Sequence, residues 1–296
     1  MEVNTRSFHL AGIIPVSGQP LDFCMDWSDC LIPIAPNYTA LEHAVVECAM
    51  AGCETIWIVC NDDISPLVRY RLGDYVVDPV SFRRFERHPS EARRQIPIFY
   101  IPVDSNEYDR RDCLGYCVLH GAKVATKISS QISKWLSPDM FYASFPYGVF
   151  DYNSIRPHRK EISKRGNILF TCGEKSINTN SYTSFTFGRK DLKVLMENFI
   201  EKATAGSVAG KRLPSEKRYS GKNFNLDIVF EPVIIKHALK IELPWFYDIG
   251  SWREYCDFLS TPESESLKVP TKGILRRSEF NPIGVDMEEI ENVKQL

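Results

Sequence analysis

The amino-acid sequence predicts an α/β fold with a mixed, mainly parallel central sheet flanked by helices. Residues 9–61 contain a strand, a turn-rich loop, a helical pattern and a second strand, which is the order of a βαβ unit. Two apolar runs, at 96–103 and 140–145, have the length and composition of strands buried inside a sheet. A helical pattern over 113–134 lies between these two runs.

The N-terminal βαβ unit organises the rest of the chain. It opens with the short apolar run Leu10-Ala11-Gly12, followed by a turn-rich loop from Ile13 to Cys30. Apolar residues spaced three and four apart then predict a helix over 39–50, which Gly52 ends. β-branched and aromatic residues predict the second strand over 55–60. Ligands of parallel sheets bind where strands reach their carboxyl ends, so we expect the loop to border any site.

Strand-like and helical patterns continue to about residue 260. The remaining expected strands are 167–171 and 181–187, and the remaining expected helices are 68–72, 189–202, 232–239 and 252–259. After Thr261 the composition turns polar, which predicts an extended tail or arm. The expected organisation is a single domain over 1–260 followed by a tail over 261–296, where a second copy or an assembly partner would bind.

Composition and charge exclude several function classes. A chain of 296 residues with a net charge of −2 has no global attraction for nucleic acid or an anionic membrane. No apolar run reaches the ~18 residues that a membrane span needs, and the N-terminus lacks the apolar core of a secretory signal. Nine scattered cysteines without a C-x-x-C pair indicate reduced, buried thiols. We therefore expect a cytoplasmic protein without membrane or specific nucleic-acid partners.

Two segments carry motifs that stand in a recognisable order. The first contains Leu10-Ala11-Gly12, Leu31-Ile32-Pro33-Ile34 and Ala51-Gly52, and the second is WFYDIGSWREY, from Trp245 to Tyr255. Together they resemble the sugar-1-phosphate nucleotidyltransferase family, which has an A-type glycosyltransferase fold. That family opens with Leu-Ala-Gly, continues with Leu-Leu-Pro-Val, and later has an aromatic residue before Asp-x-Gly-Thr and a helix. The weak similarity covers residues 8–260.

The resemblance implies a reaction and a set of site residues. The reaction is transfer of a nucleotidyl group from a nucleoside triphosphate to a sugar 1-phosphate. The implied nucleotide-binding residues are Leu10, Ala11, Gly12, Ser17 and Gly18. Asp248 is the implied catalytic residue and ligand of Mg²⁺, and Asp151, just past the strand at 140–145, is a candidate second ligand. From the residues alone, Asp248 could instead cap the helix that begins at Trp252 or occupy a turn.

The sequence also departs from the family pattern where phosphates should bind. The family's signature Arg is missing from residues 13–19, and Asp29-Cys30 replaces its Pro-Lys pair. Phosphoryl transfer depends mainly on positioning and electrostatics, so these changes remove positive charge from the reaction site. A divergent enzyme with a degenerate loop and a non-catalytic descendant, a pseudoenzyme acting as a binding or structural assembly component, both remain open. A nucleotide-sugar glycosyltransferase is a third hypothesis, but no Asp-x-Asp motif follows a strand.

Overall fold

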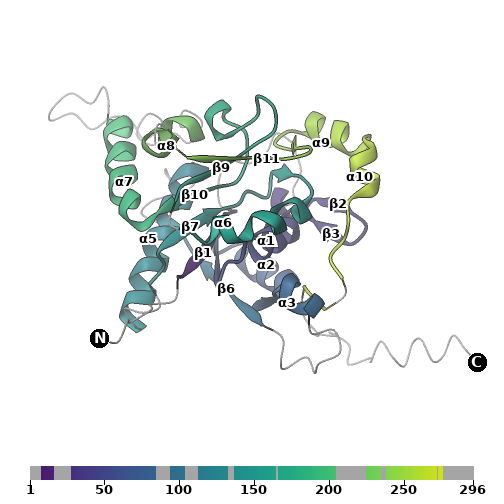
Figure 1. Ribbon diagram of the computed structural model, residues 1–296, viewed down its shortest axis with the longest axis horizontal. Helices are drawn as coiled ribbons and strands as arrows, with labels where there is room; N and C mark the ends of the chain where they lie inside the picture. Colours follow the sequence, from purple (N-terminus) through teal and green to yellow (C-terminus); the bar gives the residue numbers. More distant parts are fainter. Residues whose placement is uncertain are drawn as a thin grey trace, which may run out of the picture.

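A mixed eight-stranded sheet forms the centre of the protein (Figure 1). The computed structural model describes residues 8–16, 28–84, 94–103, 113–132, 137–164, 166–204, 225–234, 238–271 and 273–275. In chain order the strands are β1 (Leu10–Pro15), β4 (Thr55–Val59), β5 (Tyr75–Val77), β6 (Gln95–Ile101), β7 (Met140–Ala143), β9 (Ile168–Thr171), β10 (Phe185–Gly188) and β11 (Leu239–Glu242). Their spatial order is β11-β9-β10-β7-β1-β4-β6-β5. Only β5 and β10 run antiparallel to their neighbours, so the predicted mixed, mainly parallel sheet is confirmed.

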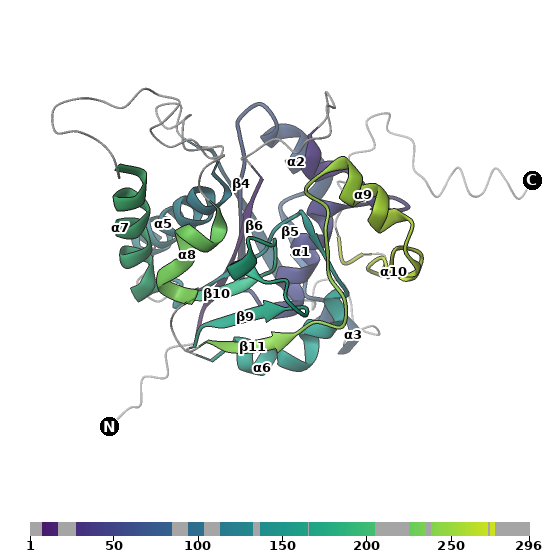
Figure 2. The same cartoon turned by 90° about the horizontal axis from the view of Figure 1, so that it is seen from above.

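Helices cover both faces of the sheet (Figure 2). One face packs against α5 (Leu114–Ile132), α7 (Arg189–Thr204) and α8 (Leu226–Ile234). The other packs against α1 (Ala40–Ala51), α2 (Ser65–Leu72), α3 (Pro79–Arg84), the 3₁₀ helix η4 (Tyr152–His158) and α6 (Arg159–Ile162). Two short helices, α9 (Trp252–Leu259) and α10 (Pro262–Ser266), lie beyond the sheet beside β2 (Pro33–Ala35) and β3 (Tyr38–Thr39). Among the described residues, no helix is long and apolar enough to cross a membrane.

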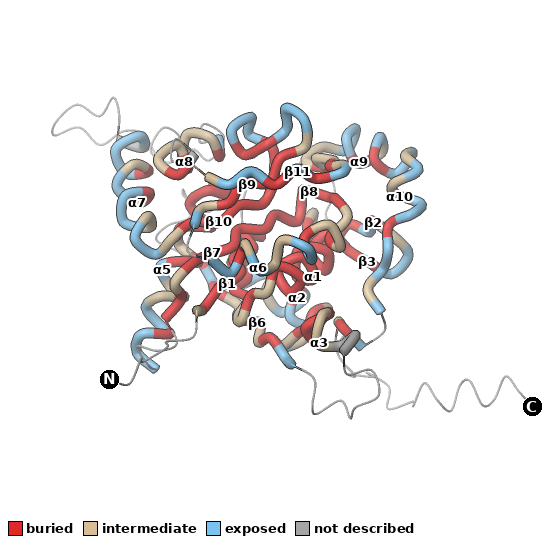
Figure 3. The backbone as a smooth tube through the Cα atoms, viewed as in Figure 1, coloured by how far each residue is buried: buried red, intermediate tan, exposed pale blue. Residues whose placement is uncertain are grey.

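Helix α1 is the most deeply buried helix of the N-terminal unit (Figure 3). It begins at a capping box, in which Thr39 and Glu42 satisfy each other's backbone N–H groups, and it ends at Gly52 with a φ of +95°. The predicted helix is confirmed, but its polar side is buried as well as its apolar side. Three ionisable side chains, Glu42, His43 and Glu47, are therefore fully enclosed.

Strand β1 is longer than the sequence indicated. It continues through Ile13 and Ile14, which lie opposite Trp57 and Ile58 of β4. The expected loop boundary at Ile13 is therefore wrong. A glycine at position 12 looked like the end of a strand, but it lies inside one because its missing side chain allows α1 to pack closely.

Two other expectations are corrected toward the C-terminus. The helix expected over 232–239 is wrong, because α8 ends at Ile234 and Leu239 already belongs to β11. Residues 261–271 and 273–275, expected in an extended tail, pack against the domain: Leu267 and Ile274 are buried. The Val77 N–H donates to the Ile274 carbonyl at 2.9 Å, so this segment covers the edge strand β5. Residues 276–296 lie outside the described residues.

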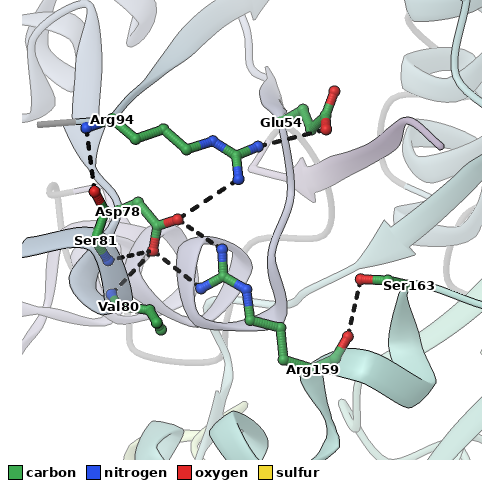
Figure 4. Close-up of polar contacts among 7 residues, drawn as sticks. All are labelled: Glu54, Asp78, Val80, Ser81, Arg94, Arg159 and Ser163. Carbon is green, nitrogen blue, oxygen red and sulfur yellow. Dashed lines mark hydrogen bonds and ion pairs between the residues drawn. The ribbon is translucent and has the colours of Figure 1, made fainter. Parts of the chain in front are cut away.

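A buried ion pair joins α6 to the β5–α3 connection (Figure 4). The Arg159 guanidinium donates to both oxygens of Asp78, at 3.0 and 2.6 Å, and Asp78 also accepts from the Val80 N–H at 2.9 Å. Arg94 lies 3.7 Å from Asp78 and 3.5 Å from Glu54. Burial alone would raise the pKa of Asp78, but the hydrogen bonds and charge of Arg159 lower it below its usual value.

Candidate functional site

Asp248 lies just beyond the carboxyl edge of the central sheet. It belongs to β12 (Tyr247–Asp248), which pairs with β8 (Gly148–Val149) so that Asp248 is opposite Gly148. Strand β8 follows β7 after one tight turn, and the Ile249 N–H donates to the Tyr147 carbonyl at 2.8 Å. The parallel strands β1, β4 and β7 end at this same edge. The carboxylate is therefore where ligands of parallel sheets usually bind.

Three neighbours hold the Asp248 carboxylate: the Tyr182 backbone, the Lys175 ammonium and the Ser181 side chain. Its Oδ1 accepts a hydrogen bond from the Tyr182 N–H at 2.9 Å, and its Oδ2 lies 4.0 Å from Lys175 Nζ. The pKa of Asp248 is raised above its usual value because burial outweighs the hydrogen bonds from Tyr182 and Ser181 and the charge of Lys175. The group therefore retains protons to a higher pH than an ordinary aspartate.

Asp248 does not cap α9. Ser251 occupies the N-cap position, where its side chain accepts from the Glu254 N–H. The alternative interpretation of Asp248 as the cap of this helix is therefore wrong, and the carboxylate is available for another role.

Lys175 supplies a cation that the sequence did not reveal. It follows β9 in a tight turn, in which the backbones of Cys172 and Lys175 exchange two hydrogen bonds of 3.0 Å around Gly173 at φ +58°. Its ammonium group lies 5.7 Å from the centre of the Phe246 ring, over which it packs. A single lysine in a polar turn carries no local signal. Lys175 lies at this edge because β9 runs in the same direction as β7, so both strands end there. That direction follows from the strand pairing and not from the local sequence.

Tyr182 packs against Gly148 in β8 and against Gly250, which follows β12. A Cβ atom at Gly250 would lie 2.8 Å from the Tyr182 ring, and one at Gly148 would clash with the Tyr182 carbonyl. These glycines therefore allow β8 and β12 to close around the tyrosine. Burial raises the pKa of Tyr182 to about 12, with further contributions from the charges of Asp248 and Glu254. Its phenol stays protonated, and so remains a hydrogen-bond donor, at neutral pH.

The N-terminal segment reaches the same edge. The Tyr255 hydroxyl of α9 donates to the Pro33 carbonyl at 2.6 Å. The pKa of buried Tyr147 is raised first by burial and then by the charges of Cys30 and Asp29, which places the end of the N-terminal loop close to this ring. The two segments that carry the family resemblance thus meet in space.

Asp151 lies at the start of the 3₁₀ helix η4. Its carboxylate caps η4, accepting from the Asn153 N–H at 3.0 Å and from Asn153 Nδ2 at 2.9 Å. It lies three residues beyond Gly148, the partner of Asp248. Within the described ranges, no group of three or more His, Cys, Asp or Glu side chains could hold a metal. Asp248 could supply one carboxylate ligand to a Mg²⁺ ion held mainly by phosphate oxygens and water.

Three of the predicted nucleotide-binding residues, Leu10, Ala11 and Gly12, lie inside β1. Leu10 and Ala11 are 1% and 0% exposed in the first half of β1. A Cβ atom at Gly12 would lie 2.8 Å from Cys48 Sγ, so this glycine packs against α1. These three residues have a packing role and offer no surface to a nucleotide. Ser17 and Gly18 lie outside the described residues.

The fold occurs in solved structures of nucleotide-sugar enzymes. A UDP-glucose pyrophosphorylase complexed with UDP-glucose matches over 88% of this chain and 98% of its own, with a TM-score of 0.54 and 13% identity. The apo form of a UDP-glucose pyrophosphorylase gives 0.52 over the same shares at 13% identity, and a UTP-bound UGPase from Acinetobacter baumannii gives 0.51 over 88% and 96% at 12% identity. No protein-family model matches the chain, and no curated protein does. The chain therefore has a sugar-1-phosphate nucleotidyltransferase-like fold, as the two motifs indicated.

Proposed function

We propose that this protein transfers a nucleotidyl group from a nucleoside triphosphate to a sugar 1-phosphate, at the sheet edge occupied by Asp248. The observation that carries the proposal is the ion pair between Asp248 and Lys175. Asp248 lies in β12, which pairs with β8 beyond the end of β7. A half-buried carboxylate and a cation together suit a site where phosphate charge is bound and redistributed.

Each residue near Asp248 has a role in this reaction. An oxygen of the sugar phosphate attacks the α-phosphorus in line, and pyrophosphate leaves. Lys175, whose side chain is 48% exposed, offsets phosphate charge from one side. The Tyr182 backbone fixes the orientation of Asp248 through its N–H. Mg²⁺ bound at Asp248 would add positive charge at the phosphates.

A second candidate function rests on a different observation. Residues 10–30 contain three aspartates and no lysine or arginine, so the loop after β1 repels a triphosphate instead of neutralising it. Asp151 uses its Oδ1 as the cap of η4. A non-catalytic descendant of the fold, acting as a binding or structural assembly component, would tolerate both changes.

Thermal unfolding with ligands tests binding. Nucleoside triphosphates with magnesium should raise the melting temperature, since a ligand at 100 times its Kd stabilises by about 2.7 kcal/mol. Asp248→Asn and Lys175→Met should each abolish the shift. Lys193→Met is the matched control, because Lys193 is 84% exposed on α7 and should leave the shift intact. An unchanged shift in both site variants would contradict the assignment of this site.

Pyrophosphate release distinguishes the two candidate functions. With a triphosphate that stabilises the protein and a panel of sugar 1-phosphates, the enzyme should release pyrophosphate and form a nucleotide sugar. Binding without release over the whole panel would favour the non-catalytic descendant. Light scattering of the same sample would then show whether the chain forms a homo-oligomer.

A further inference from the structure

Two thiols meet at the corner between α1 and β4. Cys48 lies in the last turn of α1, and Cys53 follows Gly52, which has a φ of +95°. The Gly52 N–H bonds to the Ala49 carbonyl at 3.2 Å, and the Cys53 N–H bonds to the Cys48 carbonyl at 3.1 Å. These two bonds define a Schellman motif, a helix ending that brings the side chains of its first and last residues into contact.

Both sulfur atoms face the same point on β1. A Cβ atom at Gly12 would lie 2.8 Å from Cys48 Sγ and 3.2 Å from Cys53 Sγ. The two cysteine side chains also hydrogen-bond to each other. Both residues are fully buried and carry free thiols. The helix ending therefore fixes the backbone of both residues with their two thiols directed at the same glycine.

We propose that Cys48 and Cys53 form a site of reversible thiol oxidation, with a small-molecule disulfide such as oxidised glutathione as the oxidant. One cysteine thiolate attacks a sulfur of the oxidant, forming a mixed disulfide and releasing one glutathione thiolate. The second cysteine attacks the mixed disulfide and releases the other. The protein dithiol loses two protons and two electrons, and the oxidant is reduced to two thiols. This inference does not depend on the proposed function.

The buried position of Cys48 and Cys53 determines when they can react with the oxidant. Burial raises the pKa of Cys48 well above its usual value, so this thiol is unreactive in the closed corner. Reaction requires local opening of the end of α1, or takes place before the corner forms during folding. Once formed, the bond closes a short loop and restricts the unfolded chain, which should raise the melting temperature.

Peptide mapping of the full-length protein provides the test. The chain is incubated folded, and in parallel refolded, in oxidised or reduced glutathione, then unfolded, alkylated and cut after glutamate. Cleavage after Glu47 and Glu54 releases residues 48–54, which hold both cysteines and no other. In the oxidised samples this peptide should be unalkylated and two hydrogens lighter than the dithiol. Cys113 and Cys117, at α5, are the internal control and should be alkylated.

One outcome of the peptide mapping would contradict the proposal. Alkylation of both Cys48 and Cys53 after folded incubation and after refolding in oxidised glutathione would overturn the proposal. A Cys53→Ser variant should instead show Cys48 alkylated or joined to glutathione, and should lose the oxidant-dependent rise in melting temperature. An equal rise in this variant would assign the stabilisation elsewhere and also count against the pair.

Discussion

Replacing Glu47 with glutamine should stabilise the protein at pH 8 compared with pH 4.5. The difference in free energy of unfolding between the variant and wild type should be about 3 kcal/mol more favourable to the variant at pH 8 than at pH 4.5. Glu47 lies on α1 and is fully buried. It accepts hydrogen bonds from Tyr142 and Ser144 at 2.8 Å each, and another from Ser184. Burial raises the pKa of Glu47 from 4.5 to about 7, although these hydrogen bonds oppose the shift. Glutamine keeps the size and an acceptor oxygen without the charge.

The sign follows from proton linkage. Below pH 4.5 Glu47 is protonated in the folded and the unfolded chain, so its full contribution to stability is present. Between pH 4.5 and about 7 only the unfolded chain loses the proton, and stability falls. Urea unfolding at several pH values measures the difference. A constant difference between variant and wild type over this range would contradict the buried, raised-pKa carboxyl.

His43 acts in the opposite direction over nearly the same range. It is one turn from Glu47 on α1, and burial lowers its pKa from 6.5 to about 4, although the Asp151 charge opposes the shift. As pH falls from 6.5 to 4, His43 binds a proton in the unfolded chain but not in the folded chain, so the free energy of unfolding falls by about 3 kcal/mol. The two contributions largely cancel in wild type. Glu47→Gln should therefore expose the acid sensitivity of His43, and a double variant with His43→Leu should remove it.

Replacing Arg159 with alanine should lower the free energy of unfolding by about 3 kcal/mol, because it leaves the buried Asp78 carboxylate without its bidentate partner. Asp78 is 3% exposed, and Arg94 is too distant, at 3.7 Å, to replace both hydrogen bonds. Urea unfolding at neutral pH measures the loss. Lys160→Ala is the matched control: this exposed neighbour should cost less than about 0.5 kcal/mol.

A double-mutant cycle identifies the cause of the Arg159 effect. If the cost is an unpaired charge, Arg159→Ala should cost much less in an Asp78→Asn background. Arg159 also packs over Gly52, where an added Cβ would lie 2.9 Å from its Nε. Equal costs in both backgrounds would therefore assign the loss to this packing and not to the ion pair.

Local patterns were sufficient for some of the site and insufficient for the rest. Asp248 was predicted at a strand end beside a helix, and the structure places it there with Ser251 as the cap. Gly12 matched the family's Leu-Ala-Gly motif, but it lies inside β1 and not at its end. A three-residue motif does not determine where a strand ends. Lys175 was missed because its partner Asp248 is remote in the chain and the two meet only through strand pairing.

The sequence alone determined the α/β class, the βαβ start and the helices α1, α5, α7 and α9, because apolar periodicity and helix-ending residues are local properties. Tertiary structure decided which polar groups are enclosed. Glu47 and His43 are ordinary polar residues of an amphipathic helix until Tyr142, Ser144 and Ser184 enclose Glu47, and Phe150 and Tyr152 pack against His43. The pKa values of Glu47 and His43 depend on burial and on charges from distant segments. The neighbours of Asp248 also come from distant segments, so no local sequence pattern predicts them.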